Sequence, residues 1–240
     1  MSSNDKKRLD LSESKLLLTE HQIDFYVDSL KTLIPGCNVQ KSMVYSFGDH
    51  SFHVTRYSHQ GKPVMYVERG SSGDSVNFEK HYYLKDKNVA LLTESSFTES
   101  SEYPFSYSEV FFKEGEVFFL AQRKGMTPGD HQAQPCRKTN MKPKINSASI
   151  LAMFEDALGQ RGKFDLVFEG ITKCSTSKYL VFAAKDVDGF RAPVKVDRDD
   201  EFIRELSNNP MRYKGERLKI SWAMSDKNQA TYKTGELRRD

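Results

Sequence analysis

The densest cluster of potential metal ligands contains Asp49 and three closely spaced histidines. His50 and His53 lie three residues apart, and His59 follows six residues after His53. Histidines bind zinc when their ring nitrogens converge on one point. However, residues three apart on a β-strand point to opposite faces of the sheet. We therefore interpret these histidines as turn and strand-surface residues, and we predict no metal site and no cofactor.

Other sequence signatures of catalysis are absent. The chain has no G-x-S-x-G, no H-E-x-x-H, no Walker loop and no G-x-G-x-x-G opening a helix. Gly70–Asp74 is rich in glycine and serine, but no predicted helix follows it to bind an anion, so it is interpreted as a hairpin loop. Cys37, Cys136 and Cys174 form no C-x-x-C pair and are predicted to be free thiols. We predict no catalytic residue, and an enzyme with a site assembled from distant residues stays as an alternative.

Cations alternate with aromatic residues in the second half of the chain. Proteins that bind single strands combine a positive groove with aromatic rings on which bases stack. The candidate residues for binding single-stranded nucleic acid or a protein partner are Lys178, Tyr179, Arg191, Lys195, Tyr213, Arg217 and Lys219. The simpler interpretation, which we favour, is that Phe182 and Trp222 fill a core while the cations form its solvated face.

The charge is distributed unevenly over the 240 residues. Residues 1–124 contain 15 Lys and Arg against 17 Asp and Glu, whereas residues 125–240 contain 21 against 16. The two halves thus carry net charges of −2 and +5. Domains of ~100–150 residues are the most common, so two units are expected. The basic half attracts nucleic acid or acidic partners only where its charges cluster on one face.

The first element that these residues predict is a helix beginning after Thr19. Thr19 and Gln22 have the spacing of a capping box, in which each side chain accepts a hydrogen bond from the other residue's backbone amide. Apolar residues then repeat every three or four positions from Ile23 to Ile34, and Pro35-Gly36 ends the pattern. This helix should bury one apolar stripe.

Residues 39–124 change in character to short runs rich in Val, Tyr and Phe, separated by turn-forming residues. This pattern predicts an antiparallel meander. The clearest hairpin joins Tyr107–Lys113 to Glu116–Gln122 through the two-residue turn Glu114-Gly115. Consecutive aromatic residues place apolar groups on both faces of the sheet. One face should pack on the first helix, and the other must be covered by a partner, a ligand or the second unit.

Residues 125–146 contain three prolines and no apolar periodicity, which predicts a linker. A second helix is expected over residues 147–158, ending at Gly159. The rest predicts strands over Phe164–Lys173, Lys178–Lys185 and Phe190–Val196, a short helix over 198–206, and further strands over 217–224 and 230–238.

The order strand, strand, strand, helix, strand resembles that of a small OB-fold barrel. Phe168–Ile171, Ala192–Val196 and Tyr213–Ile220 resemble segments of bacterial OB-like domains related to the anticodon-binding type. The resemblance covers residues 163–238. It implies a five-stranded barrel that the chain re-enters after the helix at Lys214-Gly215-Glu216. Pro193 would then lie at an edge or a bulge, which leaves closure of the barrel open.

The first residues of the sequence bear on its location. Met1–Asp10 is polar and leads into no apolar h-region, which predicts a cytoplasmic protein; the alternative is a periplasmic lipoprotein whose signal was removed from this sequence. The longest apolar stretches, such as Val89–Leu92, are much shorter than the ~20 residues of a membrane-spanning helix. No membrane span is predicted.

We therefore predict a strand-rich α+β protein with an antiparallel meander and a C-terminal OB-like barrel. Its predicted parts are a tether over 1–18, a helix plus meander domain over 19–124, a linker over 125–146 and an OB-like domain over 147–240. The predicted function is that of a non-enzymatic binding or accessory protein. The alternatives are a carrier that holds an apolar or lipid-like ligand in the N-terminal sheet, which requires an unfilled apolar face, and an enzyme with a dispersed site.

Overall fold

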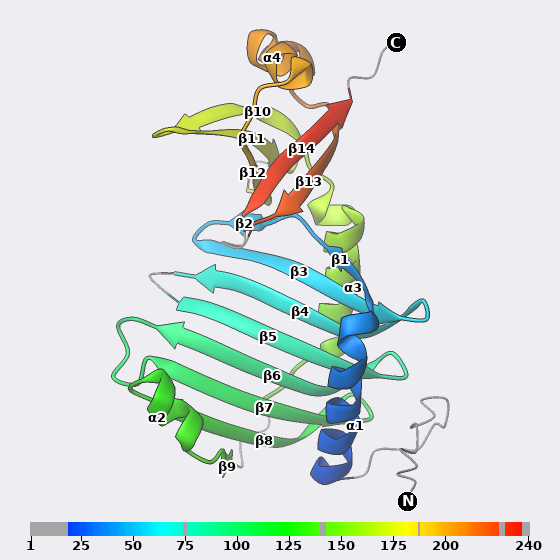
Figure 1. Cartoon of the computed structure of the whole chain (residues 1–240), viewed down its shortest axis with the longest axis vertical. Coiled ribbons are helices and arrows are strands. Elements are labelled where there is room, and N and C mark those ends of the chain that lie inside the picture. Colours follow the sequence, from blue (N-terminus) through cyan, green and yellow to red (C-terminus); the bar gives the residue numbers. More distant parts are fainter. Residues whose placement is uncertain (1–18, 74–75, 140–142, 187, 226–228, 237–240) are drawn as a thin grey trace, which may run out of the picture.

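The computed structural model describes residues 19–73, 76–139, 143–186, 188–225 and 229–236, and Figure 1 shows their arrangement. Within these residues, 14 strands form one mostly antiparallel sheet that is accompanied by five α-helices. This architecture confirms the predicted strand-rich α+β class. None of the described helices is long and apolar enough to cross a lipid bilayer.

Helix α1 spans Glu20–Leu33 and begins where the capping box predicts. The Thr19 hydroxyl accepts a hydrogen bond from the Gln22 amide, and the Gln22 side chain accepts one from the Thr19 amide. The predicted stripe is buried, with Ile23, Val27 and Leu30 at most 1% exposed. A short 3-10 turn, Ile34–Gly36, follows the helix at Pro35.

Nine strands form the N-terminal part of the sheet. They are β1 (Asn38–Lys41), β2 (Tyr45–Phe47), β3 (His50–His59), β4 (Lys62–Ser72), β5 (Val76–Lys85), β6 (Asn88–Thr98), β7 (Phe105–Lys113), β8 (Glu116–Gly125) and β9 (Arg137–Thr139). Strands β2 to β9 are antiparallel neighbours in chain order, as a meander requires, and β1 pairs with β3. The predicted hairpin between β7 and β8 is confirmed, and positive φ angles at Glu114 and Gly115 (53° and 84°) give its turn the primed twist.

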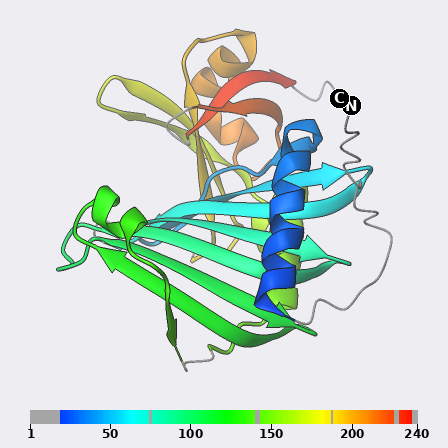
Figure 2. The ribbon, with the colours of Figure 1, turned by 60° about the horizontal axis from the view of Figure 1, so that its bottom comes forward.

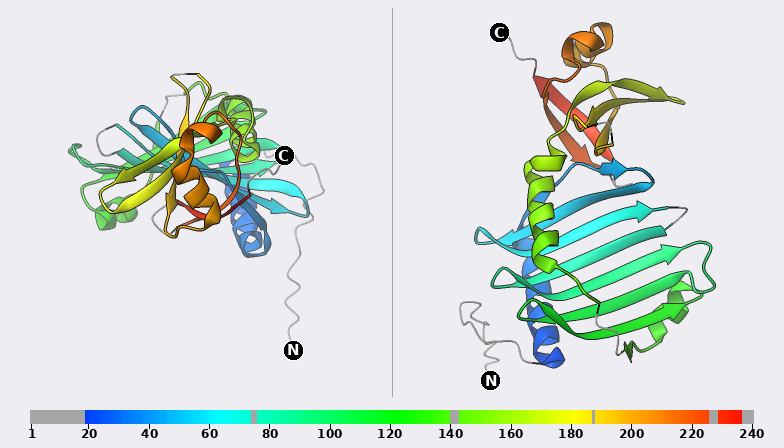
Figure 3. Two further views of the ribbon diagram at one scale, coloured as in Figure 1. Left: turned by 90° about the horizontal axis from the view of Figure 1, so that it is seen from above. Right: turned by 180° about the vertical axis from the view of Figure 1, so that it is seen from behind.

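The two faces of this meander are covered by different helices, which lie across the same end of the strands (Figures 1 and 3). Helix α1 packs on residues such as Val67, Tyr83 and Phe111. Side chains alternate along a strand, so Tyr66 and Tyr82 point to the opposite face. We name the first face the α1 face and the second the α3 face.

Helix α3, Ser147–Gly159, covers the α3 face. The fully buried Phe154 ring lies 5.7 Å from the ring of Tyr66 and 5.0 Å from that of Tyr82, centroid to centroid. The second apolar face of the meander is thus covered by the chain itself. This helix was predicted to belong to the C-terminal unit, whereas its aromatic contacts are with the N-terminal strands. The domain boundary stays a prediction.

The segment predicted as a plain linker contains two short elements. Helix α2, Pro128–Ala133, lies over β7 and β8, and strand β9 pairs with β8. Gly125 permits this close approach, since a Cβ there would stand 2.6 Å from the backbone nitrogen of His131. Apolar periodicity could not predict these elements, because α2 has no buried residue and β9 only three residues in all.

The C-terminal part follows the predicted order of elements. It contains the 3-10 turn Gly162–Phe164, β10 (Val167–Cys174), β11 (Ser177–Ala183), β12 (Arg191–Val196), α4 (Glu201–Asn208), α5 (Pro210–Tyr213), β13 (Lys219–Met224) and β14 (Ala230–Glu236). Its strands pair in the order β10-β11-β12-β14-β13, and the contact between β12 and β14 is parallel. Two backbone hydrogen bonds of 2.8 Å join Phe168 of β10 to Gly215 and Glu216, just before β13.

Strand β12 connects the two parts of the sheet. On one side it pairs with β11 along its whole length, and on the other it pairs with β2 at Arg191 and with β14 at Lys195. Pro193 lies between these two residues. Its missing amide proton therefore falls in the gap between the two pairings, where a proline is tolerated.

Candidate functional site: a polar groove on the α1 face

An open groove of about 750 Å³ is lined mainly by strands β3 to β8 and by α2. Helix α1 crosses one end of the strands and α2 lies over the other end of β7 and β8, as Figures 1 and 2 show. Between the helices, the floor of the groove is formed by side chains that point to the α1 face.

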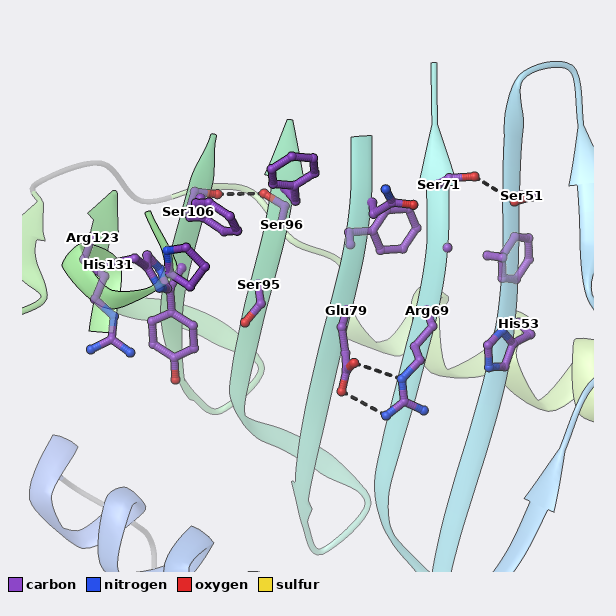
Figure 4. A pocket seen from close by; sticks show the side chains of 18 of the residues that line it. Ser51, His53, Arg69, Ser71, Glu79, Ser95, Ser96, Ser106, Arg123 and His131 are labelled. Carbon is purple, nitrogen blue, oxygen red and sulfur yellow. Dashed lines mark hydrogen bonds and ion pairs between the residues drawn. The ribbon is translucent and has the colours of Figure 1, made fainter. Parts of the chain in front are cut away.

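One row of polar and aromatic side chains crosses six neighbouring strands at this floor. Each member is the direct cross-strand partner of the next. All occupy odd-numbered positions, which on these strands point to the α1 face. The row consists of His53, Arg69, Glu79, Ser95, Tyr107 and Arg123. Figure 4 shows His53, Arg69, Glu79 and Ser95 side by side on successive strands, with Arg123 at the far end. Strand register therefore brings together residues that are up to 70 positions apart in the sequence.

The centre of the row is an ion pair with a defined geometry. The Arg69 guanidinium donates two parallel hydrogen bonds of 2.9 Å to the two oxygens of Glu79. Nε2 of His81, one row nearer to α1, lies 2.5 Å from the same carboxylate. The hydrogen bonds from His81 and Arg69 outweigh burial and lower the pKa of Glu79 to about 2. Glu79 is therefore ionised throughout the physiological range, and it neutralises the charge of Arg69.

His53 stands at the β3 end of the row and is only 3% exposed. Burial lowers the pKa of His53 to about 4, and the positive charges of Arg69 and Lys41 act in the same direction. The ring is neutral at pH 7. A neutral buried imidazole offers one donor and one acceptor to a ligand.

The opposite end of the row lies under α2. The guanidinium carbon of Arg123 stands 4.5 Å from the centroid of the Tyr107 ring, and the His131 ring approaches the same ring edge-on at 6.2 Å. The Tyr107 hydroxyl donates a 3.0 Å hydrogen bond to Glu109. Burial and the charge of Glu109 raise the pKa of Tyr107, so the phenol stays protonated.

The charges that line the groove do not cancel. Only Arg69, Glu79 and Arg123 are charged among the described lining residues at neutral pH, and Arg69 pairs with Glu79. Arg123 forms no ion pair with any described residue, and its buried Nε has no hydrogen-bond partner among them. The groove therefore carries a net charge of +1, located at its α2 end.

A second row, farther from α1, forms the rest of the floor. At the β3 end it is polar, with a 2.9 Å hydrogen bond between the hydroxyls of Ser51 and Ser71 and with Asn77 beside them. At the other end, the rings of Phe97 and Phe105 pack at 5.0 Å. The groove is thus polar at one end and aromatic with a positive charge at the other.

The cations singled out in the C-terminal half are each paired with a carboxylate. The pairs are Lys178 with Asp199 (2.5 Å), Arg191 with Glu169 (3.3 Å), Lys195 with Asp197 (2.9 Å), Lys219 with Glu236 (2.6 Å), and Arg217 with Asp165. The Tyr213 hydroxyl likewise donates to Glu205 at 2.9 Å. The net positive charge of this half is therefore not gathered in unpaired side chains at these positions.

These C-terminal residues also do not share one surface. Tyr179 and Lys195 are direct cross-strand partners, and together with Arg191 they lie on the outer side of β11 and β12. Lys178 alternates with Tyr179 and points to the side of the buried Leu180 and Phe182. Arg217 and Lys219 instead line a separate cavity of about 450 Å³ that contains Phe182 and Trp222. Phe182 is 3% exposed, as a core residue should be.

His50 and His53 point to opposite faces, as strand geometry predicts, but the prediction of a surface position is wrong for His53, which is buried. His53 faces the groove, whereas His50 stacks on Phe78 with ring centroids 5.8 Å apart, on the α3 face. The described residues contain no group of three His, Cys, Asp or Glu that could hold a metal ion. Reasoning from sequence missed Arg69, Glu79, Tyr107 and Arg123. The available signal was that these residues occupy positions on the same face of their predicted strands. Only the register of the strands shows that they lie beside one another.

Comparisons of the chain with protein-family models, with curated proteins and with solved structures found no match, so the functional argument rests on the geometry of the groove.

Proposed function

We propose that this protein binds a small polar ligand in the groove on the α1 face and catalyses no reaction there. The observation that supports this most is the row from His53 to Arg123, in which a neutral imidazole, a neutralised ion pair, a hydroxyl, an aromatic ring and a free cation line one open cavity. Ligand sites typically combine apolar walls with a few convergent polar groups, and volumes of ~300–1,000 Å³ are usual.

The polarity of the groove argues against an apolar cargo. Most apolar side chains of both faces already pack on α1 and α3, and the part that stays open contains Arg69, Glu79 and Arg123 beside the aromatic residues Phe97 and Phe105. A lipid-like ligand lying here would remove charged groups from water without compensating them. The groove therefore supports a polar ligand better than the apolar or lipid-like ligand of the carrier hypothesis.

The groove also offers little support for an enzyme with a dispersed site. Both Glu79 oxygens already accept hydrogen bonds from Arg69, and the carboxylate is a weak base because its pKa is about 2. The hydroxyls of Ser51 and Ser71 are bonded to each other rather than to a base. A general base needs an available lone pair and a pKa near the working pH.

We further propose that the C-terminal unit is an OB-like domain that supports the sheet or contacts a protein. Its strand order and the parallel contact between β12 and β14 support the fold assignment. Binding of single-stranded nucleic acid has weaker support, because the candidate cations are paired with carboxylates. Phosphate binding would have to break these pairs.

The groove hypothesis is tested by screening fragments against the isotope-labelled full chain and following backbone amide shifts. We expect hits to shift amides of β4 to β8 around the row. Ser95→Trp fills the exposed centre of the floor and should abolish these shifts. Gln122→Trp places the same ring on the opposite face of β8 and is the matched control. Hits that bind both variants equally well would overturn the proposal.

A further inference from the structure

The α2 end of the groove combines one unpaired positive charge with a cluster of aromatic rings. Arg123 lies on the Tyr107 ring, and Phe105 is the next residue on the same face of β7. The Phe97 ring packs on Phe105 at 5.0 Å. A ligand at this end would therefore meet a guanidinium and flat apolar surfaces together.

Two nitrogen atoms at this end lack hydrogen-bond partners among the described residues. They are Nε of Arg123 and Nε2 of His131, and both residues line the groove. Burial and the charge of Arg123 lower the pKa of His131, which keeps its ring neutral. Both atoms are covered by protein atoms, so the nitrogens of Arg123 left to meet a ligand in the groove are Nη1 and Nη2, which donate no hydrogen bond to a described residue.

The net charge at the α2 end of the groove determines the charge of the ligand that this end can neutralise. Arg69 is cancelled by Glu79, so the lining residues present one net positive charge, at Arg123. A single oxyanion would neutralise it, whereas a second negative charge would stay uncompensated. Guanidinium groups bind carboxylates through two parallel hydrogen bonds.

We propose that the Nη nitrogens of Arg123, beside His131, bind the carboxylate of a small aromatic acid whose ring lies against Phe97, Phe105 and Tyr107. This inference rests on the proposed function of the groove and names the ligand class and the end at which its anion binds. Helix α2 positions His131, and Gly125 lets the helix reach the sheet. The polar end near Ser71 and Asn77 then receives the remainder of the ligand.

The probe is 4-fluorobenzoate, followed by fluorine NMR with the full-length chain. For a fragment of this size we expect a dissociation constant on the order of 1 mM, with shifts of the Arg123 and His131 amides. The neutral analogue 4-fluorobenzamide should bind at least ~10-fold more weakly, because it carries no charge to pair with Arg123. Equal binding of 4-fluorobenzoate and 4-fluorobenzamide would contradict the proposal that the ligand binds through an anionic group.

Three variants locate the site. Arg123→Gln should weaken 4-fluorobenzoate binding by about tenfold or more. Gly125→Ala, which displaces α2, should weaken it while leaving Arg123 in place. Lys124→Gln removes one charge from the neighbouring residue, which points to the opposite face of β8, and should change binding less than twofold. Thermal unfolding of each variant shows that the fold is retained, and an Arg123 variant that binds like the wild type overturns the inference.

Additional probes distinguish the proposed carboxylate ligand from other ligands of the groove. Phenyl phosphate binding tenfold more tightly than the benzoate would assign the site to a phosphoryl group and overturn the carboxylate. Fragments that shift the amides of Ser71 and Asn77, without any benzoate effect at Arg123, would leave the groove as a binding site but refute this inference. If no probe shifts any groove amide at 10 mM, both proposals fail.

Discussion

Nη1 of Arg56 on β3 donates hydrogen bonds of 2.8 Å to both carboxylate oxygens of Glu155 on α3, across 99 positions of sequence. The Tyr66 hydroxyl donates to the same carboxylate at 2.5 Å. Arg56 also donates from Nη2 to Gln40 of β1, at 2.6 Å. This network holds α3 against the N-terminal strands.

The first prediction is that Arg56 and Glu155 are energetically coupled. In a double-mutant cycle with Arg56→Ala and Glu155→Ala, we expect a coupling free energy of about 1 kcal/mol, because Nη1 contacts both carboxylate oxygens but the pair is partly exposed to solvent. Urea unfolding of the four proteins measures it. A value within error of zero would mean that packing alone holds α3.

The second prediction concerns the packing of α3. Phe154 is fully buried, and its ring meets those of Tyr66 and Tyr82. Phe154→Ala should lower the free energy of unfolding by about 3–5 kcal/mol, the range for buried aromatic residues. Phe25→Ala is the control, since Phe25 is 59% exposed and should change stability by less than about 0.5 kcal/mol. Similar effects of the two changes would contradict the packing described.

The third prediction is that His53 makes stability fall as the pH is lowered. Its pKa is about 4 in the folded chain, against an ordinary value of 6.5. The unfolded chain therefore binds a proton in the window between these values while the folded chain does not, so stability is complete above pH 6.5 and declines towards pH 4. The loss attributable to His53 should reach on the order of 2–3 kcal/mol.

His53→Gln supplies the comparison, because glutamine does not titrate in this window. Chemical unfolding at several pH values between 7 and 4 should show a smaller slope for the variant than for the wild type. Glu79 adds its own loss only at lower pH, since its folded pKa of about 2 lies below the ordinary 4.5. Identical slopes between pH 6.5 and 4.5 would refute the assignment to His53.

The fourth prediction tests the domain boundary. A fragment of residues 19–160 includes α3 and should unfold cooperatively in urea. A fragment of residues 19–124 lacks α3, so it exposes the apolar surface around Tyr66, Tyr82 and Val110. We expect this shorter fragment to bind an apolar dye or to aggregate. If it is as stable as the longer one, the boundary predicted at residues 125–146 stands and α3 belongs with the C-terminal unit.

The fifth prediction addresses nucleic acid. Because the candidate cations are paired, a single-stranded oligonucleotide should bind the full chain no more tightly than tens of micromolar at low salt. Glu169→Gln together with Asp197→Asn frees Arg191 and Lys195 beside Tyr179, and should strengthen binding in a salt-dependent manner. Fluorescence anisotropy measures both. Tight binding by the wild type, reduced by Tyr179→Ala, would favour the nucleic-acid hypothesis instead.

Local patterns in the sequence predicted most of the elements, though not α2 and β9. The capping box at Thr19 and Gln22, the turn at Glu114-Gly115 and the order of strands in residues 164–236 depend on interactions between residues close in the chain, and the structure has all of them. Alternation along a strand likewise predicted that His50 and His53 face opposite sides.

Only the tertiary structure decided where α3 packs and which residues share the groove. The α3 pattern shows an apolar stripe but not its partner, because helix periodicity carries no information about distant contacts. The row from His53 to Arg123 depends on the register of five consecutive strand pairs, and a slip of one residue would turn its side chains to the other face. The ion pairs of the C-terminal cations could not be predicted from the sequence either. Most of the carboxylates that neutralise these cations lie on other strands or loops and are brought close by folding.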